Sequence, residues 1–420
     1  MQEQARRLRI GIYAGEGASH SWTWFVDLLE RFNYLRIRFV QEQDLHRHLP
    51  DLDVLILSGG DTFEVARALE PSGPQALRVF LERGGLYIGS CAGAYLPLNS
   101  SKEHLSSFNF VRAKINNLTR DLPAVRALPL KFSTRYGCTY VIHPVREEVV
   151  VRMAEDFPVW GGREVTVPLY GGPPLQPSED IEPFAFYSGF TGRTLFLTDP
   201  EIAERVYLGK IAACEKSIGA GRMVLLGPHF EHPGFPEGNA IVEEWIRWHV
   251  ARTPLRRLPE TGRREENAEG CLLDPLLLES LKKEVSNMRI RAAALARETV
   301  YWQIGAKVYE PEKVLHFVEV IWSRLARLKA QRGKTNEPGS GEPLKELAAS
   351  CHARLRELSE KVSRAQETQE LAEALFSDLR RLTAAFLESY FRTIARGEAP
   401  GRREEASAQR TMHRKALTRR

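Results

Sequence analysis

The chain has 420 residues, of which 43% are hydrophobic, and it carries a formal net charge of +5. This length and apolar content allow two or three domains, each with its own core. No stretch is typical of a membrane span, and residues 1–9 lack the apolar core of a signal peptide, so we expect a cytoplasmic protein without membrane contact. Five scattered cysteines without a Cys-x-x-Cys pair argue against a disulfide framework and against a zinc or other metal site.

Short apolar runs alternate with helix-like patterns over residues 1–254. This alternation predicts an α/β domain whose mostly parallel sheet is covered by helices on both faces. Ligands of open α/β sheets bind beyond the carboxyl ends of the strands, so candidate site residues are expected there. The expected strands are Leu8–Ala14, Leu35–Val40, Val54–Ser58, Leu86–Ile88, Val165–Tyr170, Ala185–Phe190 and Arg222–Leu226.

Cys91 lies in the segment Gly89-Ser90-Cys91-Ala92-Gly93, directly after an apolar run. A nucleophile at a sharp turn from strand to helix needs small residues on both sides, because the strained backbone brings neighbouring chain close. Such a turn aims backbone N–H groups and a helix N-terminus at the sulfur, and both favour the reactive thiolate. An ordinary buried cysteine in a strand–helix turn gives the same pattern, so the motif alone leaves both interpretations open.

A candidate base, His229, follows the apolar run Met223–Leu226, and Glu231 lies two residues further on. Residues two apart in an extended segment point to the same side, so Glu231 can orient the imidazole of His229 and stabilise its charged form. Taken singly, His229 is better interpreted as a loop histidine beside a proline. Together with Cys91, however, the pair predicts a Cys-His-Glu triad.

A glycine pair, Gly59 and Gly60, follows the expected strand Val54–Ser58. An enzyme that transfers acyl groups must stabilise an oxyanion, and backbone amides at this loop could do so together with the amide of Ala92. A plain strand-to-helix turn that uses glycine for its conformation is the alternative.

Five segments, given at the end of this paragraph, follow one another in the same order as in a known family. By them the chain resembles the class I glutamine amidotransferase-like superfamily, and most closely the domain at the N-terminus of eukaryotic biotin-protein ligases. The resemblance covers about residues 8–248 and implies a flavodoxin-like fold, with catalytic roles for Cys91, His229 and Glu231. The family usually has a proline between the histidine and the glutamate, where this chain has Phe230. The matching segments are Ile12–Gly15, Leu57–Asp61, Tyr87–Tyr95, Tyr170–Pro173 and Leu226–Glu231.

The resemblance also implies that the loop with Tyr170 and Gly171 forms a pocket wall beside the site, and a plain turn is the alternative. Glu16 follows the first expected strand and should reach the same rim, where it contacts substrate, influences the ionisation of the thiol, or belongs to a solvated loop. The chain lacks the Gly-Arg-Gly-rich adenylate loop and the Lys-Trp-Pro-Asn-Asp-type segment of a biotin ligase, so we expect no biotinylation.

Charge and composition indicate a domain boundary near Pro254. Residues 1–254 hold 27 Lys and Arg against 30 Asp and Glu, a net charge of −3, and residues 255–420 carry +8. The segment after the boundary is polar and proline-bearing, as expected of a linker. We expect an α/β domain at 1–254, a linker at 255–270, a helical domain at 271–398 and a basic tail at 399–420.

Apolar residues after the linker recur at helical spacing. They form stripes from Leu276 to Thr299, from Val314 to Leu328 and from Leu344 to Tyr390, which predict an α-helical bundle or hairpin. Its expected role is packing, against the first domain or against a second copy in a homodimer. The basic tail has no interleaved aromatic residues for base stacking, so a nucleic acid is not expected as a partner.

These features predict a cysteine hydrolase or amidotransferase that cleaves an amide or related acyl bond of a small molecule through a thioester, without a cofactor. The chain has no Gly-x-x-x-x-Gly-Lys-Ser/Thr loop for ATP, so we expect no synthetase part that would use the ammonia. The ammonia would be released into solution or supplied to a separate ammonia-accepting protein. The alternative is a non-catalytic amidotransferase-like module that binds a metabolite or partner and signals through its helices. The sequence leaves open whether those helices form a lid or a recruitment platform.

Overall fold

The computed structural model describes residues 8–116, 143–252, 271, 273–328 and 341–397. Five strands of its large sheet are parallel neighbours in the order β2-β1-β3-β4-β9, which is the order of flavodoxin-like folds. The predicted α/β class is therefore confirmed. These strands are β1 (Ile10–Tyr13), β2 (Ile37–Val40), β3 (Val54–Leu57), β4 (Leu86–Ser90) and β9 (Gly221–Leu226).

The sheet continues beyond β9 with four strands that each run antiparallel to their neighbours, in the order β8-β7-β5-β6. Two of them, β5 and β8, were not among the expected strands. Both mix charged with apolar residues. Most charged residues of β5 are partly exposed, whereas Glu215 of β8 is buried and forms an ion pair with Arg222. These strands are β5 (Val145–Met153), β6 (Glu164–Leu169), β7 (Glu182–Phe196) and β8 (Ile211–Ile218).

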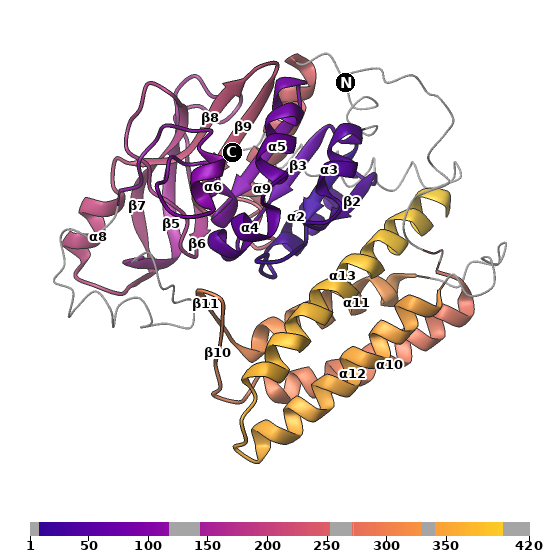
Figure 1. Ribbon diagram of the computed structural model, residues 1–420. Helices are drawn as coiled ribbons and strands as arrows, with labels where there is room; N and C mark the ends of the chain where they lie inside the picture. The colour runs from indigo at the N-terminus through magenta and orange to yellow at the C-terminus, as the bar shows by residue number, and fades with distance from the viewer. Residues whose placement is uncertain (1–7, 117–142, 253–270, 272, 329–340, 398–420) are drawn as a thin grey trace, which may run out of the picture.

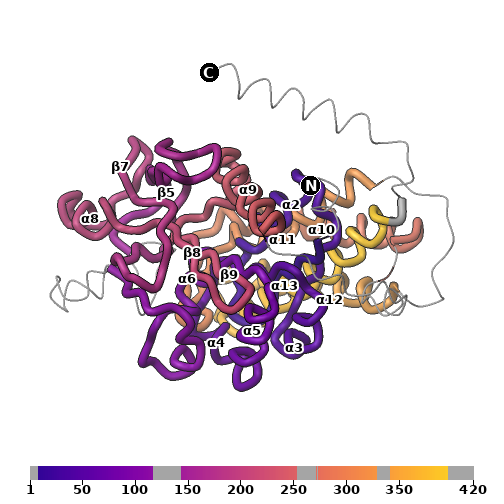
Figure 2. Tube along the Cα trace, turned by 90° about the horizontal axis from the view of Figure 1, so that it is seen from above, coloured from indigo at the N-terminus to yellow at the C-terminus, as the bar shows by residue number. Residues whose placement is uncertain are grey.

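Helices cover both faces of the sheet, as expected. Figure 2 shows α2 (Trp22–Arg31) and α9 (Pro236–Arg252) on one face and α3 (Leu45–His48), α4 (Thr62–Leu69) and α5 (Gly73–Glu82) on the other. The strands between them are almost wholly apolar and buried, which fits a sheet sandwiched between helices. Two further helices are α6 (Ala92–Tyr95) and α8 (Pro200–Tyr207), and two single turns are 105–108 and 49–51.

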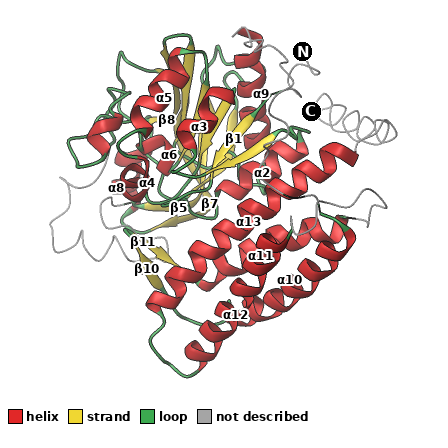
Figure 3. Cartoon of the chain, turned by 45° about the vertical axis from the view of Figure 1, so that its right-hand side comes forward, coloured by secondary structure: helices red, strands yellow, loops and turns green. Residues whose placement is uncertain are grey.

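The C-terminal region forms a bundle of four helices within the described residues, and the predicted helical domain is thus confirmed (Figure 3). Its helix α10 packs against α11 and α12, and α13 packs against α11 and α12 in turn. A two-stranded hairpin of β10 (Trp302–Ile304) and β11 (Lys307–Tyr309) interrupts it, and strands this short carry no readable periodicity. The helices are α10 (Pro275–Leu295), α11 (Pro311–Arg327), α12 (Glu342–Ser363) and α13 (Gln369–Gly397).

The two halves of the chain are joined by a buried cation. Arg324 of α11 is only 1% exposed, and its Nη2 lies 2.8 Å from both Asp27 Oδ1 and Glu30 Oε2 of α2. The hydroxyl of Tyr390 on α13 donates to the other oxygen of Glu30 at 2.6 Å. Two carboxylates offset the cost of removing the guanidinium from water. The helical half therefore packs against the α/β half of its own chain.

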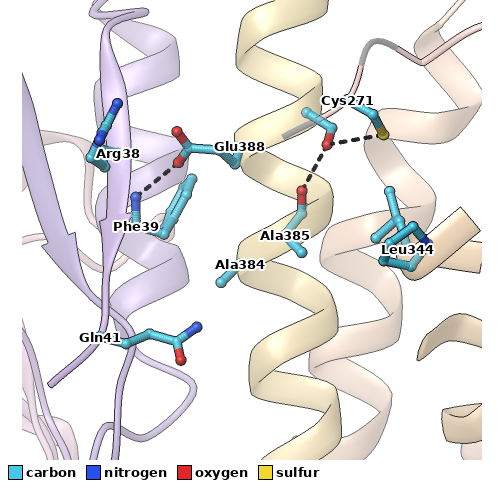
Figure 4. Close-up of a pocket in the computed structure, with 10 residues that line it drawn as sticks. Arg38, Phe39, Gln41, Cys271, Leu344, Ala384, Ala385 and Glu388 are labelled. Atoms are coloured by element: carbon cyan, nitrogen blue, oxygen red, sulfur yellow. Dashed lines mark hydrogen bonds between the residues drawn. The ribbon is translucent and has the colours of Figure 1, made fainter. Parts of the chain in front are cut away.

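A cavity of about 380 Å³ lies between β2 and α13 at this junction. Figure 4 shows Glu388 of α13 pointing at the strand, where its Oε2 accepts the backbone N–H of Phe39 at 3.0 Å. None of the site residues expected from the sequence lines this cavity. It is therefore separate from the candidate catalytic site.

The expected linker at 255–270 and the basic tail at 399–420 lie outside the described residues, and the domain limits at 254 and 271 stay predictions. In the described part of the chain, no helix is both long and apolar enough to span a bilayer.

We expect Arg324→Met to lower the free energy of unfolding by about 2 kcal/mol, because it leaves two partly buried carboxylates without their cation. Arg327→Met is the matched control. Arg327 lies on the same helix, 67% exposed and 3.7 Å from Glu30, so its loss should cost less than about 0.5 kcal/mol. Urea unfolding followed by tryptophan fluorescence measures both, and equal losses would contradict the role given to Arg324.

Candidate functional site

The backbone at Cys91 has the conformation of a nucleophile elbow. Cys91 directly follows β4 with φ +52° and ψ −105°, a strained combination for any residue with a side chain. A Cβ atom at Gly89 would lie 2.2 Å from the carbonyl oxygen of Gly93, and one at Gly93 would lie 1.9 Å from that of Leu57. The tight turn thus accepts only glycine at both flanking positions, for the reason inferred from the sequence.

His229 and Glu231 follow β9, the strand next to β4. The Nδ1 atom of His229 lies 2.7 Å from Glu231 Oε1, and the side chain of His229 is close enough to that of Cys91 to lower the pKa of the thiol. Exposed fractions are 4% for Cys91, 2% for His229 and 0% for Glu231. The structure therefore brings together the three residues that the sequence paired, with a buried hydrogen bond between His229 and Glu231 and the thiol of Cys91 beside the imidazole.

Two serines that the sequence analysis assigned no role hold the carboxylate of Glu231. Ser58, directly after β3, donates to Oε1 at 3.1 Å, and Ser90, the last residue of β4, donates to Oε2 at 3.0 Å. Ser21 at the start of α2 lies 3.0 Å from Ser58 and extends the network. A polar residue at the end of an otherwise apolar strand is the signal that could have identified Ser58 and Ser90.

The charges of the pair Cys91 and His229 stabilise each other. Burial raises the pKa of Cys91, but the positive charge of His229 and its hydrogen bond outweigh burial and bring the pKa below the ordinary thiol value. Burial lowers the pKa of His229, but Glu231 and the thiolate outweigh it and raise the pKa to about 10. Both shifts favour the ion pair of a thiolate beside an imidazolium. In contrast, burial raises the pKa of Cys214 and of Cys351 to about 12.

The expected oxyanion loop lies against the His229 ring, since a Cβ atom at Gly59 would be 3.0 Å from the ring carbon Cε1. In the antiparallel bridge between Ala18 and Gly60, the donors are the backbone N–H groups of Ser19 and Asp61. The bridge therefore does not use the N–H of Gly60. Ala92 is the first residue of α6, where a backbone N–H has no partner within the helix. These positions fit the predicted role of Gly59, Gly60 and Ala92, which stays a prediction.

The expected pocket wall also lies at this rim. The Tyr170 ring centroid is 5.7 Å from that of His229. Gly171 has φ +108°, and a Cβ there would lie 2.9 Å from Arg146 Nη1 and 3.1 Å from the His143 ring.

Glu16 faces the helical half of the chain. Its Oε2 lies 3.0 Å from Nη2 of Arg380 on α13, and its backbone N–H donates to Glu42. Glu16 therefore contributes to the contact between the halves, and the expected influence on the thiol or contact with substrate gains no support from this geometry.

A cluster of aromatic rings that the sequence analysis did not predict surrounds the base. The Trp24 ring lies 5.2 Å from that of His229 and 4.5 Å from that of His232. His316 of α11 reaches the same cluster, with Nε2 2.7 Å from Thr23 Oγ1. Burial lowers the pKa of His232 and of His316 to about 4, so both rings are neutral at neutral pH. Among the described residues, no group of three or more His, Cys, Asp or Glu side chains could hold a metal ion.

Residues 8–105 match the family model of the N-terminal domain of biotin-protein ligase, so the resemblance to this family is confirmed for that part of the chain. The matched stretch includes Cys91, whereas His229 and Glu231 lie beyond it. No curated protein matched the sequence.

Two solved structures are similar to part of this chain. A GMP synthase-like protein from Thermoplasma acidophilum is 13% identical, with 58% of this chain and 95% of that chain covered and a TM-score of 0.35. A ThuA-like protein from Bacteroides uniformis is 16% identical, with 59% and 93% covered and a TM-score of 0.37. Similarities this low say nothing about activity.

We expect Gly93→Ala to destabilise the protein by about 3 kcal/mol, because the new methyl group collides with the backbone carbonyl of Leu57. Gly192→Ala is the matched control, since a Cβ at Gly192 meets no atom within 4 Å. Thermal and urea unfolding compare the two variants. A Gly93→Ala protein as stable as the control would contradict the tight turn at Cys91.

Proposed function

We propose that this protein is a cysteine hydrolase or amidotransferase-type enzyme that cleaves an amide or related acyl bond with Cys91, His229 and Glu231. The observation that carries the proposal is the buried cluster of thiol, imidazole and carboxylate at the carboxyl ends of neighbouring strands, in which His229 is hydrogen-bonded to Glu231 and interacts with Cys91. The resemblance of residues 8–105 to an amidotransferase-like family supports the same class of reaction.

Each residue of the triad has one task in the proposed reaction. The Cys91 thiolate attacks the substrate carbonyl, a carbon–sulfur bond forms, and the electron pair of the C=O bond moves to oxygen. The amides of Gly60 and Ala92 donate to that oxyanion. Because Nδ1 of His229 is bound to Glu231, the proton for the leaving nitrogen comes from Nε2. The oxyanion then re-forms the C=O bond, the carbon–nitrogen bond breaks, the amine or ammonia departs, and the acyl group stays on Cys91 as a thioester.

Water completes the cycle when His229, now neutral, accepts a proton from it through Nε2. The resulting hydroxide attacks the thioester, the acid product leaves, and the thiolate and imidazolium are restored. Glu231 holds the ring in one orientation throughout and stabilises its positive charge. We place this reaction in the cytoplasm, where thiols stay reduced, and the described cysteines are all free. An ammonia-accepting protein and a homodimer through the helical half remain predictions.

One observation favours a second candidate, a non-catalytic module that binds a metabolite or partner. The three triad residues are almost completely buried, so substrate reaches the sulfur only if neighbouring side chains move. The reactivity of the thiol distinguishes the two candidates.

We expect iodoacetamide to alkylate Cys91 well below the pH at which ordinary thiols react. The reactive form is the thiolate, and a lowered pKa keeps it populated as pH falls through the ordinary thiol range near 8.5. His229→Ala removes the stabilising charge and leaves burial to raise the pKa, so the rate at pH 7 should fall about tenfold or more. Peptide mapping measures the label on each cysteine.

His232→Ala is the control, because this neighbouring ring is neutral and should leave the rate unchanged. Cys214 and Cys351, with their raised pKa values, should stay unlabelled. An ordinary thiol titration of Cys91 in the wild-type protein would favour the binding module.

We expect ammonia release or acyl hydrolysis when the protein is screened with glutamine and other small amides. Cys91→Ala should abolish turnover, Glu231→Gln should lower kcat about a hundredfold or more because a neutral amide no longer stabilises the imidazolium of His229, and Cys351→Ala should change nothing. A coupled ammonia assay measures these rates. Turnover that survives in Cys91→Ala would exclude the proposed chemistry.

A further inference from the structure

The β10–β11 hairpin reaches from the helical half to the loop that follows β3 (Figures 1 and 3). At its tip, the backbone N–H of Ala306 donates to Asp61 Oδ2 at 2.5 Å. Gly305 has φ +59°, and a Cβ there would lie 2.8 Å from the same oxygen. Asp61 directly follows Gly59 and Gly60, and its other oxygen caps α4 by accepting from two backbone N–H groups. The hairpin tip thus rests on the end of the expected oxyanion loop.

The hairpin is fixed in this position by its own half of the chain. Trp302 is buried, and its indole N–H donates to Thr368 Oγ1 at 3.0 Å. Nζ of Lys313 donates to the carbonyl of Val308 at 3.0 Å, and the ring of Tyr309 packs on α13. Because both strands of the hairpin are held, the position of its tip is fixed relative to the helical half.

Lys307 directly follows Ala306, whose backbone N–H binds Asp61, so this contact brings the positive charge of Lys307 close to the loop of Gly59 and Gly60. This charge contributes to the lowered pKa of Cys91, after burial and His229, and to the lowered pKa of His143, after burial and Arg146. Lys307 is only partly buried, and no hydrogen bond or ion pair joins its ammonium group to another residue that the structure describes. The ammonium is therefore able to meet a negative group on a substrate.

A second cation, Arg146 of β5, is buried beside Gly171 and His143 at the expected pocket wall. The carboxylates at this rim are already engaged. Glu231 is bound by His229 and two serines, and Asp61 is bound by Ala306 and the first turn of α4. Hydrogen bonds hold both carboxylates in place beside the hairpin tip that carries Lys307.

We propose that the hairpin tip is part of the catalytic site and that Lys307 selects acyl substrates of net negative charge, by pairing with an anionic group such as a carboxylate or phosphate. This inference rests on the proposed function, since it concerns what Cys91 attacks. It also gives the helical half a role beyond packing, because that half supplies a specificity determinant to a site built otherwise from the α/β half.

Two alkylating reagents of similar size and different charge test this without knowledge of the substrate. Iodoacetate is anionic and iodoacetamide is neutral, and both alkylate only the thiolate. Their rate ratio at Cys91 is therefore independent of how much thiolate is present and reports the attraction for the negative charge. We expect Lys307→Gln to lower the iodoacetate to iodoacetamide ratio about five- to tenfold at low salt, while Lys307→Arg keeps it. The measurement uses the full chain and peptide mapping of Cys91.

Lys283→Gln is the matched control, because Lys283 is an exposed lysine on α10 and its loss should leave the ratio unchanged. An unchanged ratio in Lys307→Gln, with Cys91 still labelled rapidly by iodoacetamide at neutral pH, overturns the inference and leaves the proposed function standing. If neither reagent labels Cys91 faster than an ordinary thiol, the proposed function fails and this inference fails with it. A higher salt concentration should reduce the wild-type ratio towards that of Lys307→Gln.

Discussion

The carboxylate of Glu231 has no exposed surface, and its need for hydrogen-bond donors organises the catalytic rim. A buried carboxylate is costly unless each oxygen is satisfied. Its donors come from three places, namely Ser58 after β3, Ser90 at the end of β4 and His229 after β9. The group is therefore satisfied only when three neighbouring parallel strands end in register. The same strands set the position of Cys91 relative to the imidazole.

The helical half is built onto this rim at two distant places. Arg324 ties α11 to two carboxylates of α2, and the hairpin tip reaches Asp61 at the start of α4. The helices α2 and α4 cover opposite faces of the sheet (Figure 2). Contacts on both of them fix the orientation of the bundle relative to the catalytic rim better than either contact alone. The arrangement resembles neither a detached platform nor a free lid.

Much of the fold and the core of the candidate site could be predicted from local sequence. Cys91 between two glycines and Glu231 two residues after His229 are short-range patterns, and their meeting follows from the rule that parallel strands end at one edge. The contacts of Glu16, Trp24 and Lys307 could not be predicted, because they depend on partners far along the chain. Glu16, for example, meets Arg380 across 364 positions, and no pattern near Glu16 encodes that partner. Strands β5 and β8 were missed because their charged residues interrupt the apolar runs.

The contact between Glu388 and Phe39 has a consequence for solubility. β2 is the outermost strand of the sheet on its side, and an open outer strand offers backbone groups to any other chain that can add a strand. Helix α13 lies along this edge strand, and the carboxylate of Glu388 accepts a hydrogen bond from the backbone N–H of Phe39. The helical half thus shields the sheet from growing by intermolecular pairing, and an α/β half produced alone would display a border prone to aggregation.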